Sequence, residues 1–283
     1  MNDQDLAIAC EQYEQRGYCR LPGLIDDHLL RQFNDGLETL IDCAGGQRDD
    51  PFHEGLVGLD QRDHAIIAQL YETLRNSDAL CRIIYDAGVL RAVRGMMELD
   101  THEPLYLLQH SCRIDPPSDE RFTYKWHQQS YYSVYESEEV QAWMPLVLPS
   151  DASMGTISVL EGSHHGEVDH VIKHTEGGHS QMLVPDDQVA GRWSEVFIES
   201  RPGDMLLFHP YLIHRSNINT SDKVRYSLVA TYVNPMDERF KLSPLPQMVS
   251  YHSARCVNSG DESDNHLSGL KAGWGSGVTR FKD

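Results

Sequence analysis

The first hundred residues carry their hydrophobic side chains at the spacing of amphipathic helices. One apolar stripe recurs every three or four positions: Leu29, Leu30, Phe33, Leu37 and Leu40. Asp26 or Asp27 is suited to cap the start of this helix, and Gly45-Gly46 is suited to end it. Similar patterns predict further helices over residues 5–15, 63–74 and 77–96.

From Leu105 onward the pattern changes to short apolar segments separated by clusters of Pro, Gly, Asp and Ser, which is typical of strands and turns. The predicted strands cover residues 106–114, 140–148, 156–160, 196–198, 205–208 and 226–233. This succession predicts a mainly β fold, an antiparallel double-stranded β-helix (a jelly-roll, cupin-like barrel) with the N-terminal helices packed on one sheet. At 283 residues we expect a single domain with a helical part (1–104), a barrel core (105–240) and a C-terminal tail (241–283).

Polar residues in the second half of the chain have the types and spacing of a non-haem iron site. Residues i and i+2 of an extended strand point to the same side, so His127 and Gln129 can converge on one ion while Gln128 faces away. His214, on a later strand, would supply a second imidazole. Two imidazoles and one oxygen donor leave three octahedral positions for a co-substrate and dioxygen, so we expect these three residues to be the metal ligands and catalytic residues.

Two more residues near His214 suggest a carboxylate site. Arg225 precedes the apolar run 226–233, and its guanidinium could hold a carboxylate through two parallel hydrogen bonds. Ser216 lies two residues after His214, so it would face the same way and add a hydroxyl.

These residues belong to a longer series of motifs in a fixed order: Gln15-Arg-Gly-Tyr-Cys-Arg-Leu-Pro-Gly-Leu24, Trp126-His127-Gln128 with Tyr131, Trp143-Met-Pro-Leu146, Leu160-Glu-Gly-Ser-His164, Gly203-Asp204, His214, Ser216 and Arg225. Each is weak alone, but the ordered set resembles the phytanoyl-CoA dioxygenase family of Fe(II)/2-oxoglutarate-dependent oxygenases. The resemblance implies that His127 and His214 bind iron and that Arg225 and Ser216 hold the distal carboxylate of 2-oxoglutarate. It also implies that Gln109 contacts this co-substrate, and Trp143 is expected to wall the same cavity.

The resemblance implies an Fe(II)-, 2-oxoglutarate- and O2-dependent dioxygenase that oxidises a C–H bond of a small molecule. Hydroxylation is the expected outcome, although desaturation, cyclisation or epimerisation can follow from the same radical. A small polar metabolite or an intermediate of secondary metabolism fits better than an acyl-CoA, because no cluster of Lys and Arg awaits the phosphates. Tyr131 and Tyr132 at the pocket mouth, and Arg215 for an anionic group, are the candidate substrate residues.

Position 129 departs from the family, where the residue is usually Asp. Glutamine is a neutral oxygen donor, so it binds a hard divalent cation less tightly than a carboxylate and leaves the iron centre one charge unit more positive. Three interpretations of Gln129 stay open. It is a natural ligand of a working oxygenase, it is a substitution made to trap an inactive complex, or the protein has lost oxidation and keeps the pocket for binding. A halide at a vacant ligand position fits less well, because glutamine is not small. A cupin-type metal enzyme that uses no 2-oxoglutarate is a further alternative, against which stands the spacing from His214 to Arg225.

Composition and charge narrow the partners and the location. The net charge is −19, and no basic run occurs that would neutralise phosphates, which argues against nucleic acid or an anionic membrane as partner. The six cysteines show no CxxC pairing and read as reduced cysteines of a cytoplasmic protein. The start of the chain has no positively charged region followed by an apolar segment, and no 18-residue apolar run follows, so secretion and membrane spanning are not expected. The sequence does not fix the oligomeric state, and a homo-oligomer is compatible with it.

The segment from His164 to Trp193 is predicted to be a long loop, rich in His, Gly and acidic residues. Loops longer than about 12 to 15 residues in a compact domain are usually functional or disordered. The irregular spacing of its histidines favours solvated side chains over a second metal site: His164, His165, His170, His174 and His179.

Overall fold

The computed structural model describes residues 1–46, 49–120, 123–132, 138–174 and 180–238. Its helices are α1 (Asp3–Arg16), α2 (Asp27–Cys43), α3 (Leu56–Arg62), α4 (His64–Arg75), α5 (Asp78–Ile84), α6 (Ala87–Met96) and α7 (Asp186–Val189), with a π-helix over Pro51–Gly55 and 3₁₀ turns over Gln129–Tyr132 and Ser163–His165. Its strands are β1 (Tyr18–Leu21), β2 (Tyr106–Asp115), β3 (Glu139–Pro145), β4 (Ile157–Leu160), β5 (Val171–His174), β6 (Ser180–Leu183), β7 (Glu195–Phe197), β8 (Met205–Phe208), β9 (His214–Ser216) and β10 (Arg225–Val233). The predicted C-terminal tail lies outside the described residues.

The predicted N-terminal helices are confirmed, and their capping residues explain their limits. The Asp26 side chain accepts a hydrogen bond from the His28 amide at the start of α2, and α1 ends at Gly17 in the left-handed conformation with φ of 84°. The helix predicted over residues 77–96 is instead two helices, α5 and α6. Asp86 starts the second one, because its carboxylate accepts hydrogen bonds from the amides of Gly88 and Val89 at 2.7 and 3.3 Å.

The larger sheet has five antiparallel strands in the order β1-β8-β3-β10-β2. Strand β1 lies in the part of the chain that was predicted to be helical, and it pairs with β8 from Tyr18 opposite Phe208 to Leu21 opposite Met205. A four-residue strand between two helices is too short for a clear period-two pattern, so its pairing comes from tertiary contacts.

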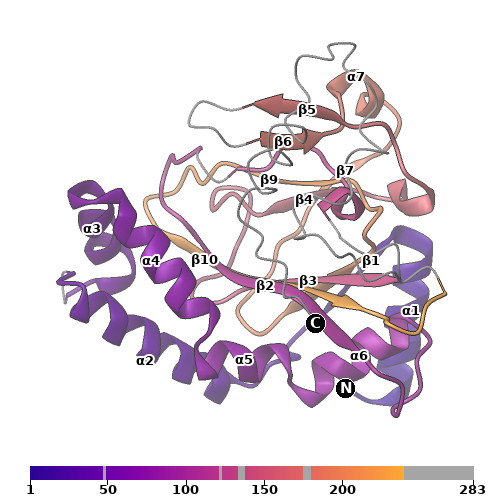
Figure 1. Ribbon diagram of the computed structural model, residues 1–283, viewed down its shortest axis with the longest axis horizontal. Coiled ribbons are helices and arrows are strands. Elements are labelled where there is room, and N and C mark those ends of the chain that lie inside the picture. The colour runs from indigo at the N-terminus through magenta and orange to yellow at the C-terminus, as the bar shows by residue number, and fades with distance from the viewer. Residues whose placement is uncertain (47–48, 121–122, 133–137, 175–179, 239–283) are drawn as a thin grey trace, which may run out of the picture.

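The second sheet has three antiparallel strands in the order β7-β4-β9 and lies across from the five-stranded sheet (Figure 1). Helices α2, α5 and α6 cover the opposite face of the larger sheet, so the described fold has a helical layer, a large sheet and a small sheet (Figure 1). The mixed helical and antiparallel character is as predicted. Within the described residues the two sheets do not close into a barrel.

The prediction that the segment from His164 to Trp193 is one long loop is wrong. Its described parts form the hairpin of β5 and β6 followed by α7. His164 and His170 are buried, at 7% and 0% exposure, so the expectation of solvated histidines is wrong for both. Their side chains hydrogen-bond to backbone atoms of distant segments, and such long-range partners cannot be seen in local sequence. His179 lies outside the described residues.

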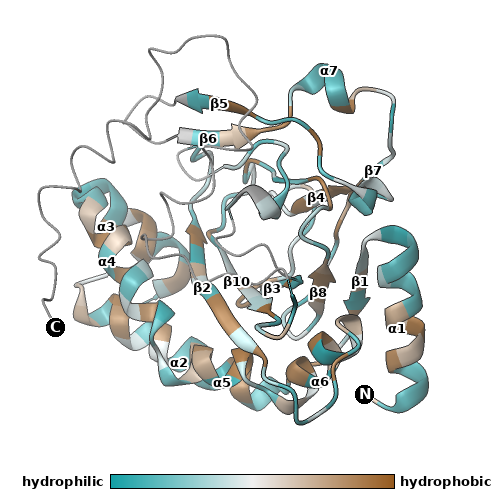
Figure 2. Ribbon diagram, turned by 45° about the vertical axis from the view of Figure 1, so that its right-hand side comes forward, coloured by the Kyte–Doolittle hydropathy of each residue, from teal (hydrophilic) through white to brown (hydrophobic). Residues whose placement is uncertain are grey.

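Two hydrophobic cores lie on either side of the larger sheet. The main core joins the apolar faces of the helices to one face of the sheet, and Figure 2 shows these helices with alternating hydrophobic and hydrophilic turns. The second core lies between the two sheets and includes Trp143, Ile157, Leu206 and Phe208. No helix in the described part of the chain has both the length and the apolar character needed to cross a bilayer.

A test of the fold concerns Gly155, in the turn that leads into β4. Its φ is +69°, and a Cβ atom at this position would lie 2.5 Å from the Asn217 carbonyl oxygen and 2.7 Å from the Asn219 nitrogen. We expect Gly155→Ala to lower the free energy of unfolding by roughly 3 kcal/mol or more in urea denaturation, since backbone strain and steric overlap add. Gly162 is the matched control, with φ of +77° and no atom within 4 Å of its Cβ position. Gly162→Ala should cost only about 1–2 kcal/mol, and equal losses at the two positions would contradict the close approach.

Candidate active site

Strand β10 separates the main core from a cavity between the two sheets. Tyr226, Leu228, Ala230 and Tyr232 pack into the helical side of the sheet. Arg225 and Val229 line the cavity, as period-two alternation requires. The cavity has a volume of about 480 Å³ and is lined by side chains from both sheets, α4 and the segment around His127. It is large enough for a small organic molecule.

The structure brings His127 and His214 together at one wall of this cavity. The two residues form an antiparallel bridge in which each backbone N–H donates to the other's carbonyl oxygen at 3.0 Å. Their imidazole rings lie with centroids 4.1 Å apart. Since both rings line the cavity, the two residues are in position to bind one metal ion together.

Backbone hydrogen bonds fix which nitrogen each ring presents. Nδ1 of His127 lies 2.7 Å from the Lys125 carbonyl oxygen, and Nδ1 of His214 lies 2.9 Å from the Leu212 carbonyl oxygen. A carbonyl oxygen only accepts, so Nδ1 carries the proton in each ring and donates it. Nε2 is therefore the atom with the lone pair, as in a histidine ligand oriented by its other nitrogen.

Burial keeps both imidazoles neutral. It lowers the pKa of His127 well below its ordinary value, and repulsion from a charged His214 lowers it further. Burial also lowers the pKa of His214 to about 4, opposed by its hydrogen bond to the Leu212 carbonyl. A metal ion binds the neutral form of imidazole, so a divalent ion meets little competition from protons at neutral pH. The residues present fit an iron ion in their charge state and donor atoms.

Gln129 and Gln128 have different surroundings, as predicted, although Gln129 lies in a 3₁₀ turn and not on an extended strand. Gln129 begins the 3₁₀ turn Gln129–Tyr132 and lines the cavity beside the two histidines. Gln128 is fully buried away from the cavity, where its amide nitrogen donates to the carbonyl oxygens of Gly166 and Tyr211 and its amide oxygen accepts from Val168 N–H. Gln128 therefore holds the segment that carries its neighbours in place.

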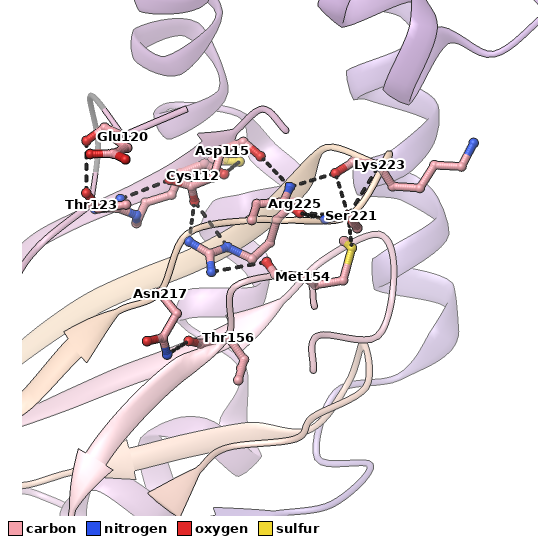
Figure 3. A network of polar contacts seen from close by, with 12 residues as sticks. Cys112, Asp115, Glu120, Thr123, Met154, Thr156, Asn217, Ser221, Lys223 and Arg225 are labelled. Atoms are coloured by element: carbon pink, nitrogen blue, oxygen red, sulfur yellow. Dashed lines mark hydrogen bonds and ion pairs between the residues drawn. The ribbon is translucent and has the colours of Figure 1, made fainter. Parts of the chain in front are cut away.

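Arg225 lies in the cavity wall in a buried ion pair with Asp115, shown in Figure 3. Its Nη2 and Nε atoms donate to Oδ2 of Asp115 at 2.8 and 3.2 Å, and its Nη1 donates to the Met154 carbonyl oxygen at 3.4 Å. Arg113 donates to the other oxygen, Oδ1, at 3.0 Å. The carboxylate of Asp115 thus orients two cationic side chains that line the cavity.

The other predicted co-substrate residues also line the cavity. Ser216 lies on β9, Trp143 on β3 and Gln109 on β2. The amide nitrogen of Gln109 donates to the Thr231 hydroxyl at 3.3 Å, and that hydroxyl donates to the amide oxygen of Gln141 at 2.6 Å. These three residues face one another across β2, β10 and β3, so they form a polar ladder on the cavity face of the sheet.

The candidate substrate residues lie in different places. The Tyr132 hydroxyl is 3.0 Å from both the Met182 carbonyl oxygen and the Met182 nitrogen, and its ring contacts that of His127, so it lies in the cavity wall. Tyr131 belongs to the same 3₁₀ turn. Arg215 was predicted to bind an anionic group of the substrate, but it is not among the residues that line the cavity. Its guanidinium donates to Glu195 at 2.6 Å and stacks on Trp126. It lies between His214 and Ser216 on β9, so alternation directs it to the other face.

Sequence reasoning missed several cavity residues: Tyr71, Arg75, Arg113, Tyr124 and Gln141. Arg113 had a usable signal, because it lies four residues after Gln109 on the same strand and therefore faces the same side. Tyr71 and Arg75 had none, because a helical residue reaches the cavity only through the way α4 packs on β2.

Comparison with known proteins places these features in a family. The family model described as phytanoyl-CoA dioxygenase (PhyH) matches residues 13–227. A 1-deoxypentalenic acid 11-beta-hydroxylase from Streptomyces arenae is 27% identical over 227 residues, covering 74% of this chain and 73% of the relative. The enzyme of the same name from Streptomyces exfoliatus is 25% identical over 249 residues, covering 85% and 80%.

Solved structures support the same fold. The epimerase SnoN, in a complex with Fe3+, alpha ketoglutarate and nogalamycin RO, is 16% identical, with a TM-score of 0.60 and 93% of each chain covered. EctD from S. alaskensis, with 2-oxoglutarate and 5-hydroxyectoine, is 17% identical, with a TM-score of 0.58 and 91% of this chain and 87% of that chain covered. At these identities the likeness concerns the fold.

Asp115 provides a test of the buried ion pairs. Burial favours the neutral carboxyl and would raise its pKa, but Arg113 and Arg225 together hold the pKa below its ordinary value. Replacing Asp115 by Asn leaves two buried guanidinium groups facing a neutral amide, so we expect Asp115→Asn to lower the free energy of unfolding at pH 7 by about 3–5 kcal/mol. Urea denaturation at pH 7, 5 and 3 measures this loss.

The sign of the pH dependence follows from the lowered pKa. The Asp115 contribution is complete above about pH 5 and declines as the pH falls past the unfolded-state value of about 3.9 and through the folded-state pKa. The difference between wild type and Asp115→Asn should therefore narrow in acid. Asp78→Asn is the control, since Asp78 pairs with Arg82 on the surface and is 77% exposed; it should cost less than about 1 kcal/mol. A pH-independent difference would refute the lowered pKa.

Proposed function

The chain belongs to the phytanoyl-CoA dioxygenase family, and we propose that it is an Fe(II)- and 2-oxoglutarate-dependent dioxygenase that hydroxylates a small molecule of secondary metabolism. The motifs predicted the family, and this prediction is confirmed. The family uses Fe(II), 2-oxoglutarate and O2, so the predicted class of enzyme and its cofactors are confirmed with it.

The histidine pair is the observation that carries the proposal. His127 and His214 are neutral, have Nδ1 tied to backbone carbonyls and lie against one cavity. We assign them as iron ligands through Nε2, with the Gln129 side-chain oxygen as the third protein donor. When bound, Fe(II) with 2-oxoglutarate and O2 supplies the oxidising power to remove hydrogen from a substrate carbon. The protein's own part is to orient the ligands and to exclude water.

Arg225 and Ser216 are the proposed site for the distal carboxylate of 2-oxoglutarate. Arg225 is 4% exposed, and its partner Asp115 holds the guanidinium in one orientation before any ligand arrives. A buried and oriented guanidinium is a strong donor to a carboxylate. Gln109 and Trp143 lie on adjoining strands of the same wall and complete the co-substrate site in this proposal.

The remaining cavity is proposed to hold the substrate. Two relatives are named as hydroxylases of 1-deoxypentalenic acid, and this supports a small organic substrate and hydroxylation as the reaction here. Tyr132 and Tyr131 are proposed to border this part of the site. The proposal also takes the two sheets as the two halves of a double-stranded β-helix and the whole chain as one domain. A cytoplasmic location is proposed because the described cysteines are free.

Gln129 favours a second candidate, a family member that binds 2-oxoglutarate without turnover. A neutral amide oxygen is a weaker donor than a carboxylate for a hard cation. In this alternative the cavity, the histidine pair and Arg225 keep their binding roles, and oxidation is lost.

Anaerobic titration with Fe(II) and 2-oxoglutarate distinguishes the two candidates. We expect the wild-type protein to develop the visible metal-to-ligand charge-transfer band and to consume 2-oxoglutarate in air. Gln129→Asp and Gln129→Glu should lower the Kd for Fe(II) roughly tenfold, because they restore a carboxylate donor. His214→Ala should abolish the band. His64→Ala is the control, because His64 is 71% exposed and lies outside the cavity.

The possible outcomes separate cleanly. If only the carboxylate variants bind iron and consume 2-oxoglutarate, the chain is the non-oxidising form. If neither the wild type nor Gln129→Asp nor Gln129→Glu develops the band, the assignment of His127 and His214 to iron is wrong.

The role of Arg225 has its own test. Arg225→Gln should raise the Kd of 2-oxoglutarate on the order of a hundredfold, since removing one partner of a buried charge pair costs about 2–5 kcal/mol. Calorimetric titration under anaerobic conditions measures the Kd. Arg215→Gln is the matched control, because Arg215 lies on β9 but faces Glu195 outside the cavity. Equal losses in the two variants, or no loss in Arg225→Gln, would count against the assignment.

A further inference from the structure

The helix α4 forms a second wall of the cavity, opposite in charge to the chain as a whole. Tyr71 and Arg75 lie one helical turn apart on the same face of α4, and both line the cavity. The His110 Nε2 atom hydrogen-bonds to the Arg75 carbonyl oxygen at 2.9 Å, which fixes the end of the helix to β2. The backbone of Arg75 is therefore held at a defined place beside the cavity.

The cavity lining carries more positive charge than one bound anion would neutralise. Among the described residues that line it are Arg75, Arg113 and Arg225, and none is Asp or Glu. Asp115, behind the wall, offsets one charge of the pair Arg113 and Arg225. The third protein donor proposed for iron, Gln129, adds no negative charge. In a chain with a net charge of −19, this concentration of positive charge points to anionic ligands.

Strand register places the backbone of Arg75 and that of Arg225 near different parts of β2. On β10, Arg225 pairs with Asp115, and Ala230 pairs with His110, the residue that holds Arg75. These two pairs are five residues apart, which corresponds to about 17 Å along the strand. This distance separates backbone positions, and it exceeds the length of a five-carbon dicarboxylate. In the proposed arrangement a co-substrate held at Arg225 extends toward the histidine pair, so Arg75 is left to a second ligand.

The Arg75 guanidinium has unused capacity for a ligand. Its Nε atom is buried and has no hydrogen-bond partner among the described residues. Its Nη1 atom lies 3.5 Å from Glu72, in a solvent-exposed pair that contributes little. The side chain is 43% exposed, so a ligand that enters from solvent can reach it. A partly exposed arginine on a cavity rim, whose guanidinium is not fully paired, is suited to a carboxylate.

We infer that the substrate carries a carboxylate and that Arg75 binds this group at the cavity rim, so that the uncharged body of the molecule extends toward the histidine pair. The inference rests on the proposed function and specifies its substrate class. Arg75 is a specificity residue in this arrangement, because it fixes which end of the substrate stays away from the metal ligands.

Adamantane-1-carboxylate and adamantane-1-carboxamide are suitable probes, because they share one apolar body and differ in charge. Calorimetry with protein loaded anaerobically with Fe(II) and saturating 2-oxoglutarate gives the Kd of each. We expect the wild type to bind the carboxylate about tenfold more tightly than the amide, as for a charge-assisted hydrogen bond. Arg75→Gln should bring the ratio close to one, and Arg75→Lys should keep part of the preference. Arg82→Gln is the matched control, an exposed arginine in a surface pair with Asp78.

Each other outcome overturns the inference in a recognisable way. If Arg75→Gln weakens both probes equally, Arg75 only shapes the rim. If the Kd of the carboxylate rises with the concentration of 2-oxoglutarate, the probe occupies the co-substrate site. No preference in a wild-type protein that forms the charge-transfer band overturns the substrate class and leaves the proposed function intact. A wild type without the band overturns the proposed function and the inference together.

Discussion

The reciprocal backbone hydrogen bonds between His127 and His214 are the constraint on which the site depends. They join a segment between β2 and β3 to strand β9 of the small sheet, so the two imidazoles approach only when both sheets are in place. Gln128 reinforces the same junction from behind, through hydrogen bonds to the segments after the 3₁₀ turn Ser163–His165 and before β9. The geometry of the candidate metal site is therefore a property of the assembled fold.

Strand β10 transmits this order to the rest of the cavity. Its apolar side chains are fixed in the helical core, and its alternate residues are consequently fixed in the cavity wall. A slip of one residue would place Tyr226 in the cavity and Arg225 in the core, where a lone guanidinium has a high desolvation cost. The buried aromatic residues Tyr226 and Tyr232 thus help to set the position of Arg225, together with its ion pair to Asp115.

The sequence predicted those parts of the structure that depend on local pattern. Helices α1, α2 and α4 and strands β2, β3, β8 and β10 follow apolar periodicity and capping residues, whereas α3 was missed. The predicted site residues His127, Gln129, His214 and Arg225 line one cavity, and their roles stay a prediction. The pair of Arg225 with Asp115 was not predicted, since it depends on the register between β10 and β2. Strand β1, the burial of His170 and the position of Arg75 were missed for the same reason, because each depends on contacts with distant segments.

The distribution of charge connects the two arginine sites to Gln129. A carboxylate at position 129 would offset part of the charge of a divalent ion, whereas glutamine leaves that charge to be balanced by ligands. Arg113 and Arg225 share one carboxylate, and Arg75 has only an exposed partner, so the protein itself supplies little compensation. A cavity of this kind is most stable when anions occupy it, because burying positive charge without a counterion is costly. In the proposed function, the weak metal donor Gln129 and the anion-binding arginines act together, because the bound anions help to retain the metal ion.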